Sequence, residues 1–257
     1  MSTKFIILGS GSSMGVPRAD GFFGKCDLRN KKNFRTRCSA IIQFNKENIL
    51  IDTSPDLRQQ LLDNKIRSIS KVFYTHLHAD QTHGINDLRP FFLINKKQIP
   101  VFADIKTSKY LYTTFKYCFK SSYGYPSTLR LNILKKMHTF IKSNQKILIE
   151  TIPVEHGNIN SICYLINKKL AYASDISLFY KNDMKKLTNL NYLVIDCLWY
   201  KNHTAHYNLK EVLALVKILK PKKTILTNMH SDLDYAVLKK NLPKNIIPGY
   251  DGMKIDL

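Results

Sequence analysis

Three histidines and an aspartate lie within the ten residues THLHADQTHG, at positions 75–84. Three of these side chains, His76, His78 and Asp80, occupy every second position and directly follow an apolar run that predicts a strand. In an extended segment alternate side chains point to the same side, so two imidazoles and a carboxylate can be directed at one point. Imidazole and carboxylate groups are ligands for zinc and related divalent ions. The spacing therefore predicts a metal site.

Three further residues with ligand side chains each follow a predicted strand. They are His156 in PVEHGN, Asp175 in AYASDIS and His230 in LTNMHSD. Each has an ordinary alternative on its own, because Asp175 could cap a helix and either histidine could lie in a surface turn. Their shared position at the carboxyl ends of strands favours one common site.

The elements that would position these residues alternate between strands and helices. Apolar, β-branched runs bounded by turn residues predict strands at 5–8, 39–44, 49–51, 71–74, 99–102, 147–152, 162–166, 170–173, 192–195 and 223–226. Helical patterns of apolar residues cover 56–62, 85–93, 108–119, 178–187, 209–219 and 233–242. This order predicts an α/β protein in which two sheets face each other and helices cover their outer faces.

We expect residues 1–257 to form a single domain, in which residues 105–146 could be a cap insertion over the site. Basic and aromatic residues alternate in this insertion, as they do in proteins that hold single-stranded nucleic acid. However, Tyr112, Phe115 and Phe119 follow a helical spacing, which favours a buried helix face.

The charge of the chain is strongly positive. It has 40 basic and 19 acidic residues, a net charge of +21, which favours phosphates, nucleic acid or anionic surfaces as partners. Most of the basic residues are lysine, so a general compositional bias explains the charge equally well.

The lack of a recognisable membrane span or signal peptide predicts a cytoplasmic protein. No apolar run is long enough for a membrane span, and the apolar run 5–8 is too short for a signal peptide. The five cysteines are scattered and odd in number, which predicts free thiols.

On these residues the chain resembles the metallo-β-lactamase-fold hydrolases, whose signature HxHxDH is followed by a separate His, an Asp and a last His at strand ends. The similarity extends over essentially the whole chain and is greatest for the branch with the cyclic-phosphate phosphodiesterase of phosphonate breakdown. The segments that carry it are GSSMGVP, RTRCSAII, IDTSPDLR, THGINDLR and HTAHYN. The resemblance implies a four-layer αββα sandwich.

The resemblance also implies two divalent metal ions, zinc or manganese. His76, His78 and His156 would form one site. Asp80 and His230 would contribute to a second site, with Asp175 as the bridging ligand.

The chain departs from the family pattern at Gln81, where a histidine is usual. An amide oxygen is a poorer zinc ligand than imidazole but is acceptable to manganese. The second site could be weakened, it could prefer manganese, or His83 could replace the missing ligand from the same helix face. We favour a weakened second site, with His83 beside it but not bound to metal.

Other residues could contact the substrate. The resemblance implies that His206 of HTAHYN borders the active site, where it would hold the substrate phosphate or protonate the leaving oxygen. His203 lies in the same loop and is as readily an ordinary surface residue. Arg18 and Arg37 belong to an arginine-rich first quarter of the chain, and guanidinium groups match paired phosphate oxygens.

We therefore predict a phosphodiesterase for a small cyclic phosphate or nucleotide, in which metal-activated hydroxide attacks phosphorus. Asp80 would orient the water molecule and His206 would act as the acid. One alternative is an RNA-processing endonuclease of the same fold, which the charge favours. The other is a non-catalytic protein that binds metal or a nucleotide. The expected partner is a small phosphate-containing substrate; nucleic acid is a further candidate, a membrane is not, and the chain could form a homodimer.

Overall fold

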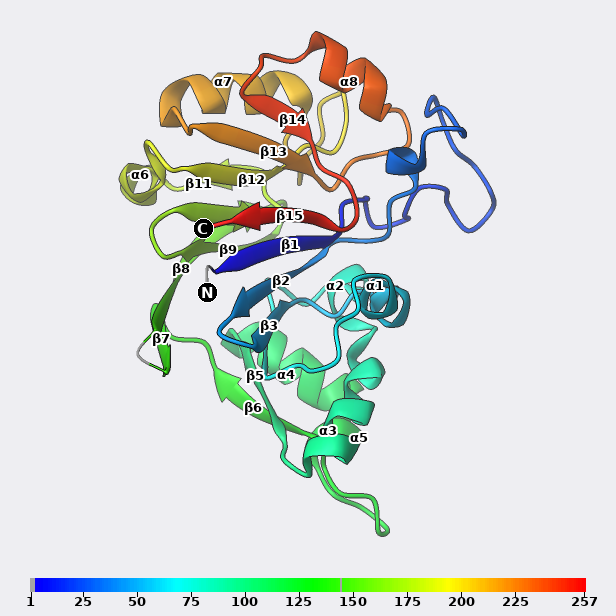
Figure 1. Ribbon diagram of the computed structural model, residues 1–257, viewed down its shortest axis with the longest axis vertical. Coiled ribbons are helices and arrows are strands. Elements are labelled where there is room, and N and C mark those ends of the chain that lie inside the picture. Colours follow the sequence, from blue (N-terminus) through cyan, green and yellow to red (C-terminus); the bar gives the residue numbers. More distant parts are fainter. Residues whose placement is uncertain (1–2, 144) are drawn as a thin grey trace.

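Two β-sheets form the centre of the molecule, and helices cover both outer faces (Figure 1). The computed structural model describes residues 3–143 and 145–257. The first sheet has the strand order β15 (Met253–Asp256), β1 (Lys4–Gly9), β2 (Ser39–Phe44), β3 (Glu47–Ile51), β4 (Lys71–Phe73), β5 (Ile99–Ala103) and β6 (Leu129–Ile133). The second has the order β11 (Leu178–Phe179), β8 (Gln145–His156), β9 (Ile159–Ile166), β10 (Leu170–Ala173), β12 (Tyr192–Asp196), β13 (Lys223–Thr227) and β14 (Ile246–Pro248), with β7 (Met137–Lys142) paired to β8.

The helices divide between the two outer faces. Those along the first sheet are α1 (Leu57–Asp63), α2 (Ala79–Thr82), α3 (Arg89–Asn95), α4 (Ile105–Thr114) and α5 (Lys116–Phe119). Those along the second sheet are α6 (Lys181–Met184), α7 (Leu209–Leu219) and α8 (Tyr235–Asn241). Short 3₁₀ turns lie at Lys31–Asn33, Ile85–Leu88 and Lys185–Leu187. The predicted four-layer αββα arrangement is confirmed.

Strand β1 shows how one run of apolar residues supplies two layers of the core. Phe5 and Ile7 pack between the two sheets, whereas Ile6 and Leu8 pack on the opposite side with α1 and its neighbours. Successive side chains of a strand point to opposite faces, so a strand buried on both faces must be apolar throughout. The ring of Phe5 meets that of Tyr172 from β10 at a centroid distance of 5.3 Å, which joins the sheets.

Parallel pairing brings the ends of many strands to one edge of the molecule. β3, β4, β5 and β6 run parallel in the first sheet, and β10, β12, β13 and β14 run parallel in the second. β8 has the same direction as β10, because each pairs antiparallel with β9. The residues that follow these strands therefore gather at this edge, where ligands bind in open α/β sheets.

Two sequence predictions need correction. The helix expected at 178–187 is divided into β11, α6 and a 3₁₀ turn, because Phe179 pairs with Val154 at the edge of the second sheet. Most of 105–146, which could have formed a cap insertion, is part of the main layers: α4 and α5 pack on the first sheet through Leu111 and Cys118, and β6 and β7 each join a sheet.

The two ends of the described chain lie side by side (Figure 1). Lys4 of β1 pairs with Asp256 of β15, and the amide of Leu257 donates to the carbonyl of Thr3. The five cysteines are buried and free, as predicted. Across the described residues, no helix combines the length and apolar character needed to cross a membrane.

Candidate active site

Three histidines from two strand ends converge on one point. His76 and His78 follow β4, and His156 is the last residue of β8 in the opposite sheet. His78 Nδ1 lies 3.0 Å from His76 Nε2 and 3.3 Å from His156 Nε2. This is the group that the alternating spacing of His76 and His78 predicts, completed by His156.

Hydrogen bonds on the far side of two rings fix which nitrogen faces this point. The Nδ1–H of His156 donates to the carbonyl of Ala205 at 2.7 Å. Thr75 Oγ1 donates to Asp52, so it accepts from His76 Nδ1, which lies 3.0 Å away. Both Nε2 atoms therefore carry lone pairs, and His78 Nδ1 cannot donate one proton to both of them.

The electrostatic environment keeps these rings neutral. Burial lowers the pKa of His76 well below its ordinary value, and the neighbouring His156 and His78 add to the effect. Burial likewise lowers the pKa of His156 to about 4. Neutral imidazoles with converging lone pairs are suited to bind a cation.

The geometry of the three nitrogens fits one divalent ion. Around a tetrahedral zinc ion with Zn–N lengths of about 2.0–2.1 Å, neighbouring ligand nitrogens lie roughly 3.3 Å apart. Two of the three separations, 3.0 and 3.3 Å, are close to this value, and the third is below 4.8 Å. We call His76, His78 and His156 the three-histidine group.

A second group lies beside the first and shares His156 with it. Ligand atoms of His156, Asp175 and His206 all lie within 4.8 Å of one another. Asp175 follows β10, and His206 lies in the loop before α7, with its ring centroid 4.7 Å from that of His156. His206, which the resemblance implies borders the active site, is thus one of the three members of this second group.

His206 is held by a buried carboxylate. Its Nδ1–H donates to Asp196 Oδ2 at 2.6 Å. Burial alone would lower the pKa of His206, but the charge of Asp196, its hydrogen bond, and the charges of Asp175 and Asp80 raise it to about 9. His206 can therefore carry a proton at neutral pH. His203, in the same loop, has its ring 5.0 Å from that of His206 and accepts from the amide of Ala205.

Asp80 and Asp175 lie on either side of the amide of Gln81. Gln81 Nε2 donates to Asp80 Oδ2 at 3.1 Å and to Asp175 Oδ2 at 3.2 Å. Burial, followed by the charge of Asp80, raises the pKa of Asp175. The carboxylates predicted to serve a second ion are therefore present, but an amide N–H group lies between them.

The sequence analysis missed Asn228, which is the residue that follows β13 and reaches the site. Its Nδ2 lies 3.3 Å from Asp175 Oδ1 and 3.3 Å from Asp196 Oδ1. An asparagine at a strand end gives no ligand signal in a sequence. The signal that could have found it is its position, directly after a buried parallel strand.

The structure places His230 elsewhere. Asn228 has a left-handed backbone, φ 58°, so the chain turns just after β13 and carries His230 away from Asp175. The ring of His230 lies over Trp199 at 4.8 Å, and its Nδ1 is 3.7 Å from Asp232. Within the described residues, His230 belongs to neither ligand group.

His83 lies against two aromatic residues. Its Nε2 lies 3.0 Å from the hydroxyl of Tyr110, and its ring packs edge-on against Phe115. Within the described part of the chain, His83 belongs to neither ligand group.

The two arginines predicted to contact substrate are both paired with carboxylates. Arg37 binds Asp56 through two guanidinium nitrogens, at 2.8 and 2.6 Å. Arg18 forms an ion pair with Asp20. Arg37 lies near enough to Asp80 for the two charges to interact, whereas Arg18 lies near His230, away from the ligand groups. Both guanidinium groups already have carboxylate partners.

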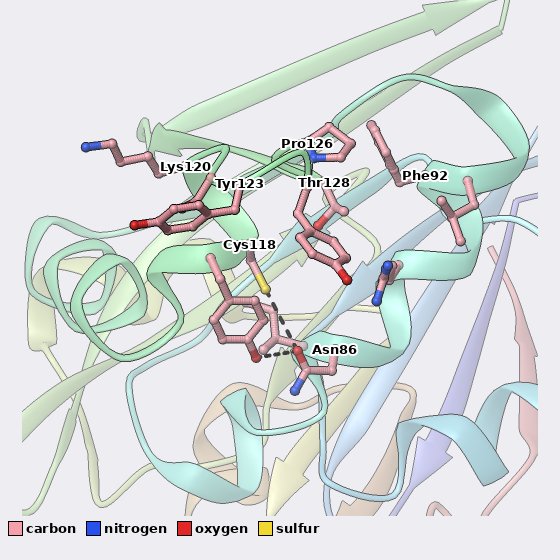
Figure 2. A pocket seen from close by; sticks show the side chains of 13 residues that line it. Asn86, Phe92, Cys118, Lys120, Tyr123, Pro126 and Thr128 are labelled. Atoms are coloured by element: carbon pink, nitrogen blue, oxygen red, sulfur yellow. Dashed lines mark hydrogen bonds between the residues drawn. The ribbon is translucent and has the colours of Figure 1, made fainter.

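A larger cavity lies apart from these groups. It has a volume of about 500 Å³ and is lined mainly by apolar side chains of α3, α5 and the loop that follows α5. Figure 2 shows Phe92, Tyr123 and Pro126 around it, with Cys118 and Asn86 joined by a hydrogen bond. None of the residues of the two ligand groups is among its described lining residues.

Comparison with known proteins agrees with this geometry. Residues 47–229 match the family model of the β-lactamase superfamily domain, and the chain belongs to this superfamily. The crystal structure of a new diphosphatase from the PhnP family is 30% identical, with a TM-score of 0.90 over 100% of this chain and 98% of that one. The protein is therefore a metallo-β-lactamase-fold hydrolase near the PhnP branch.

Two other relatives differ more. An octanoyltransferase of Porphyromonas gingivalis (strain ATCC BAA-308 / W83) is 28% identical over 255 residues, which are 98% of this chain and 51% of that protein. The chain thus spans about half the length of this curated relative. The short form of human tRNase Z shares the fold, at 15% identity and a TM-score of 0.69 over 98% of each chain.

Proposed function

We propose that the protein hydrolyses a small phosphoric ester, with a cyclic phosphate or nucleotide as the substrate class. The observation that carries the proposal is the position of His206 beside the three-histidine group, 4.7 Å from His156 between ring centroids. A metal-binding point and a proton donor are then adjacent, as ester hydrolysis requires.

A divalent ion bound to His76, His78 and His156 would acidify a water molecule and polarise the phosphoryl oxygen. Asp80 would accept a hydrogen bond from that water and so orient it. His206 would give its Nε2 proton to the leaving oxygen, since Asp196 holds its Nδ1–H and keeps the ring charged. The predicted role of His206 as an acid is thus retained in the proposal.

Small substrates suit the limited space and charge around the three-histidine group. A cavity of about 350 Å³ lies next to His156, lined by Asp104, Lys106, Glu155 and residues 157–160. Lys106 is near enough to lower the pKa of His78, after the larger effect of burial. A single phosphate could therefore be attracted by Lys106, whereas Arg18 and Arg37 are already paired.

A hydrolysis screen tests the proposal. The full chain, supplied with zinc or manganese, is offered 2′,3′-cyclic nucleotides, ribose cyclic phosphates, nucleoside diphosphates and short RNA. The diphosphates are included because the PhnP-family relative is described as a diphosphatase. We expect turnover of a cyclic phosphate, and a loss of at least about 10²-fold in His206→Asn, which removes the proposed acid.

The control is Asp63→Asn, which removes an exposed carboxylate of α1 and should leave turnover unchanged. Equal activity of His206→Asn and the wild type would contradict the proposal. If metal binds but none of the substrates is cleaved, a non-catalytic binding protein becomes the better interpretation.

The second candidate is an RNA-processing endonuclease. The net charge of +21 favours it, because phosphate chains are attracted to basic proteins. The fold shared with human tRNase Z allows this activity without assigning it. Cleavage of RNA, with cyclic phosphates untouched, would favour the nuclease.

A further inference from the structure

Both oxygens of the central carboxylate, Asp175, already accept a hydrogen bond from an amide. Oδ2 accepts from Gln81 Nε2 at 3.2 Å, and Oδ1 accepts from Asn228 Nδ2 at 3.3 Å. Asp175 is buried, at 3% exposure, so these amides take the place of water as hydrogen-bond donors to its carboxylate. A bridging ligand must instead direct its lone pairs at metal ions.

The position that a second ion would occupy is filled by the Gln81 amide. Gln81 Nε2 lies 3.1 Å from Asp80 Oδ2 and 3.2 Å from Asp175 Oδ2, and therefore between the two carboxylates. A cation cannot occupy the point between the two carboxylates where this N–H donor lies. Gln81 is fully buried, which leaves the amide no room to move into solvent.

Rotation of the Gln81 amide would not restore a metal site. Oε1 would then face the carboxylates and could serve an ion. However, Nε2 would move to the place of Oε1, a buried position where Oε1 has no hydrogen-bond partner among the described residues. A buried N–H group without an acceptor is costly.

Asn228 has a similar arrangement at the other side of the site. Its Nδ2 is 3.3 Å from Asp175 Oδ1 and 3.3 Å from Asp196 Oδ1, so it links two buried carboxylates. The nearest imidazole, His206, has its Nδ1 on Asp196 at 2.6 Å. The group of His156, Asp175 and His206 shares His156 with the three-histidine group, so it does not provide an independent set of three ligands.

We propose that this chain is a mononuclear metalloprotein, in which the amides of Gln81 and Asn228 replace the second metal ion by donating hydrogen bonds to Asp80, Asp175 and Asp196. The proposal deepens the proposed function, on whose metal site it depends, and replaces the expectation of a weakened second site. The positive end of two amide dipoles and the imidazole of His206 balance the carboxylates instead of a cation.

Metal stoichiometry tests this proposal without any substrate. Metal-free protein is titrated calorimetrically with zinc and, separately, with manganese, and the retained metal is measured by elemental analysis after gel filtration. We expect one ion per chain for the wild type. In Gln81→His/Asn228→His, which supplies two imidazoles beside Asp80 and Asp175, we expect two ions per chain.

Manganese resonance spectra give a second measurement that does not depend on affinity alone. The wild type should show the signal of an isolated ion at every ratio of manganese to protein. The double variant should show the exchange-coupled signal of two neighbouring ions. His230→Ala is the matched control and should keep one ion, because His230 packs on Trp199 away from the carboxylates.

Two ions in the wild type, or an exchange-coupled signal in it, would overturn the proposal whether or not the variants fold. A folded double variant that still binds one ion would also overturn it, since the amides would then not be the reason for the missing site. These results are separate from those of the hydrolysis screen. One bound ion without any hydrolysis removes the proposed function and leaves the mononuclear site, whereas two ions with turnover do the reverse.

Discussion

At the scale of single residues, the site depends on how neighbours orient each ligand ring. Thr75 connects His76 to Asp52: its hydroxyl donates to Asp52 Oδ2 at 2.9 Å, and its Oγ1 lies 3.0 Å from His76 Nδ1, from which it accepts. Partners of this kind fix the tautomer of a ligand histidine and increase its affinity for metal. Thr75 should therefore matter for metal binding although it would not contact the ion.

Replacement of Thr75 by valine tests this role. The shape is kept and the hydrogen bond is lost, so we expect the Kd for zinc to rise by about 10–100-fold. Competition with a fluorescent chelator measures this value. Thr151→Val is the control, because its hydroxyl donates to the carbonyl of Lys135, away from the histidines. Identical zinc affinities in Thr75→Val and the wild type would show that the connection to Asp52 is unimportant.

At the scale of secondary-structure elements, the sequence predicted the buried strands well and the exposed elements poorly. All ten predicted strands are present, because each is an apolar run bounded by turn residues. The strands β6, β7, β11, β14 and β15 were not predicted. β6 and β7 lie at sheet margins, and their sequences, LRLNI and MHTFIK, mix polar and apolar residues. A sequence shows burial more readily than pairing.

The site was predictable where its residues follow strands and carry ligand side chains, as His76, His78, His156 and Asp175 do. It was not predictable at β13. Asn228 and His230 both follow this strand, and only the left-handed turn at Asn228 decides which of them faces Asp175. Such a turn depends on tertiary contacts that local sequence does not reveal.

Asp251 connects separate elements and has a consequence for stability. It follows β14 and accepts hydrogen bonds from the amide and hydroxyl of Ser10, after β1, and from those of Thr36, before β2. Burial raises its pKa to about 6, although these hydrogen bonds act in the opposite direction. The folded protein therefore holds this proton more tightly than the unfolded chain, whose carboxyl has the ordinary pKa of 3.8.

This carboxyl should lower stability as the pH rises. Its contribution to the free energy of unfolding is most favourable below pH 3.8 and is lost between about pH 4 and 6. The difference between the two pKa values corresponds to about 3 kcal/mol. We expect the free energy of unfolding of the wild type, relative to Asp251→Asn, to fall by about that amount from pH 4 to pH 7. Denaturant titrations of both proteins at the two pH values measure it. A constant difference between them would contradict the assignment.

At the scale of the whole molecule, the net charge of +21 and the three-histidine group point to different partners. A long RNA would cover many basic residues, whereas a small cyclic phosphate would meet only the few near the histidines. The two cases differ in how salt affects them, because each phosphate neutralised by the protein releases a counterion.

The salt dependence of kcat/KM should therefore be weak for the preferred substrate. We expect a change of less than about 10-fold between 50 and 200 mM salt for a cyclic phosphate, against about 10³–10⁵-fold for an RNA held through 6–10 phosphates. Initial rates at low substrate concentration give this value. A steep decrease with a cyclic phosphate would mean that more of the basic surface contacts it than we propose.

The pairing of β1 with β15 affects how the molecule can be joined to others. β1 runs parallel to β3, since both are antiparallel to β2, so it begins at the edge opposite to the one where the histidines gather. β15 is antiparallel to β1 and ends at that same rear edge. A fusion partner, or a tether to a solid support, attached at either end would thus extend from the edge opposite to the three-histidine group. The site would then stay accessible to solutes.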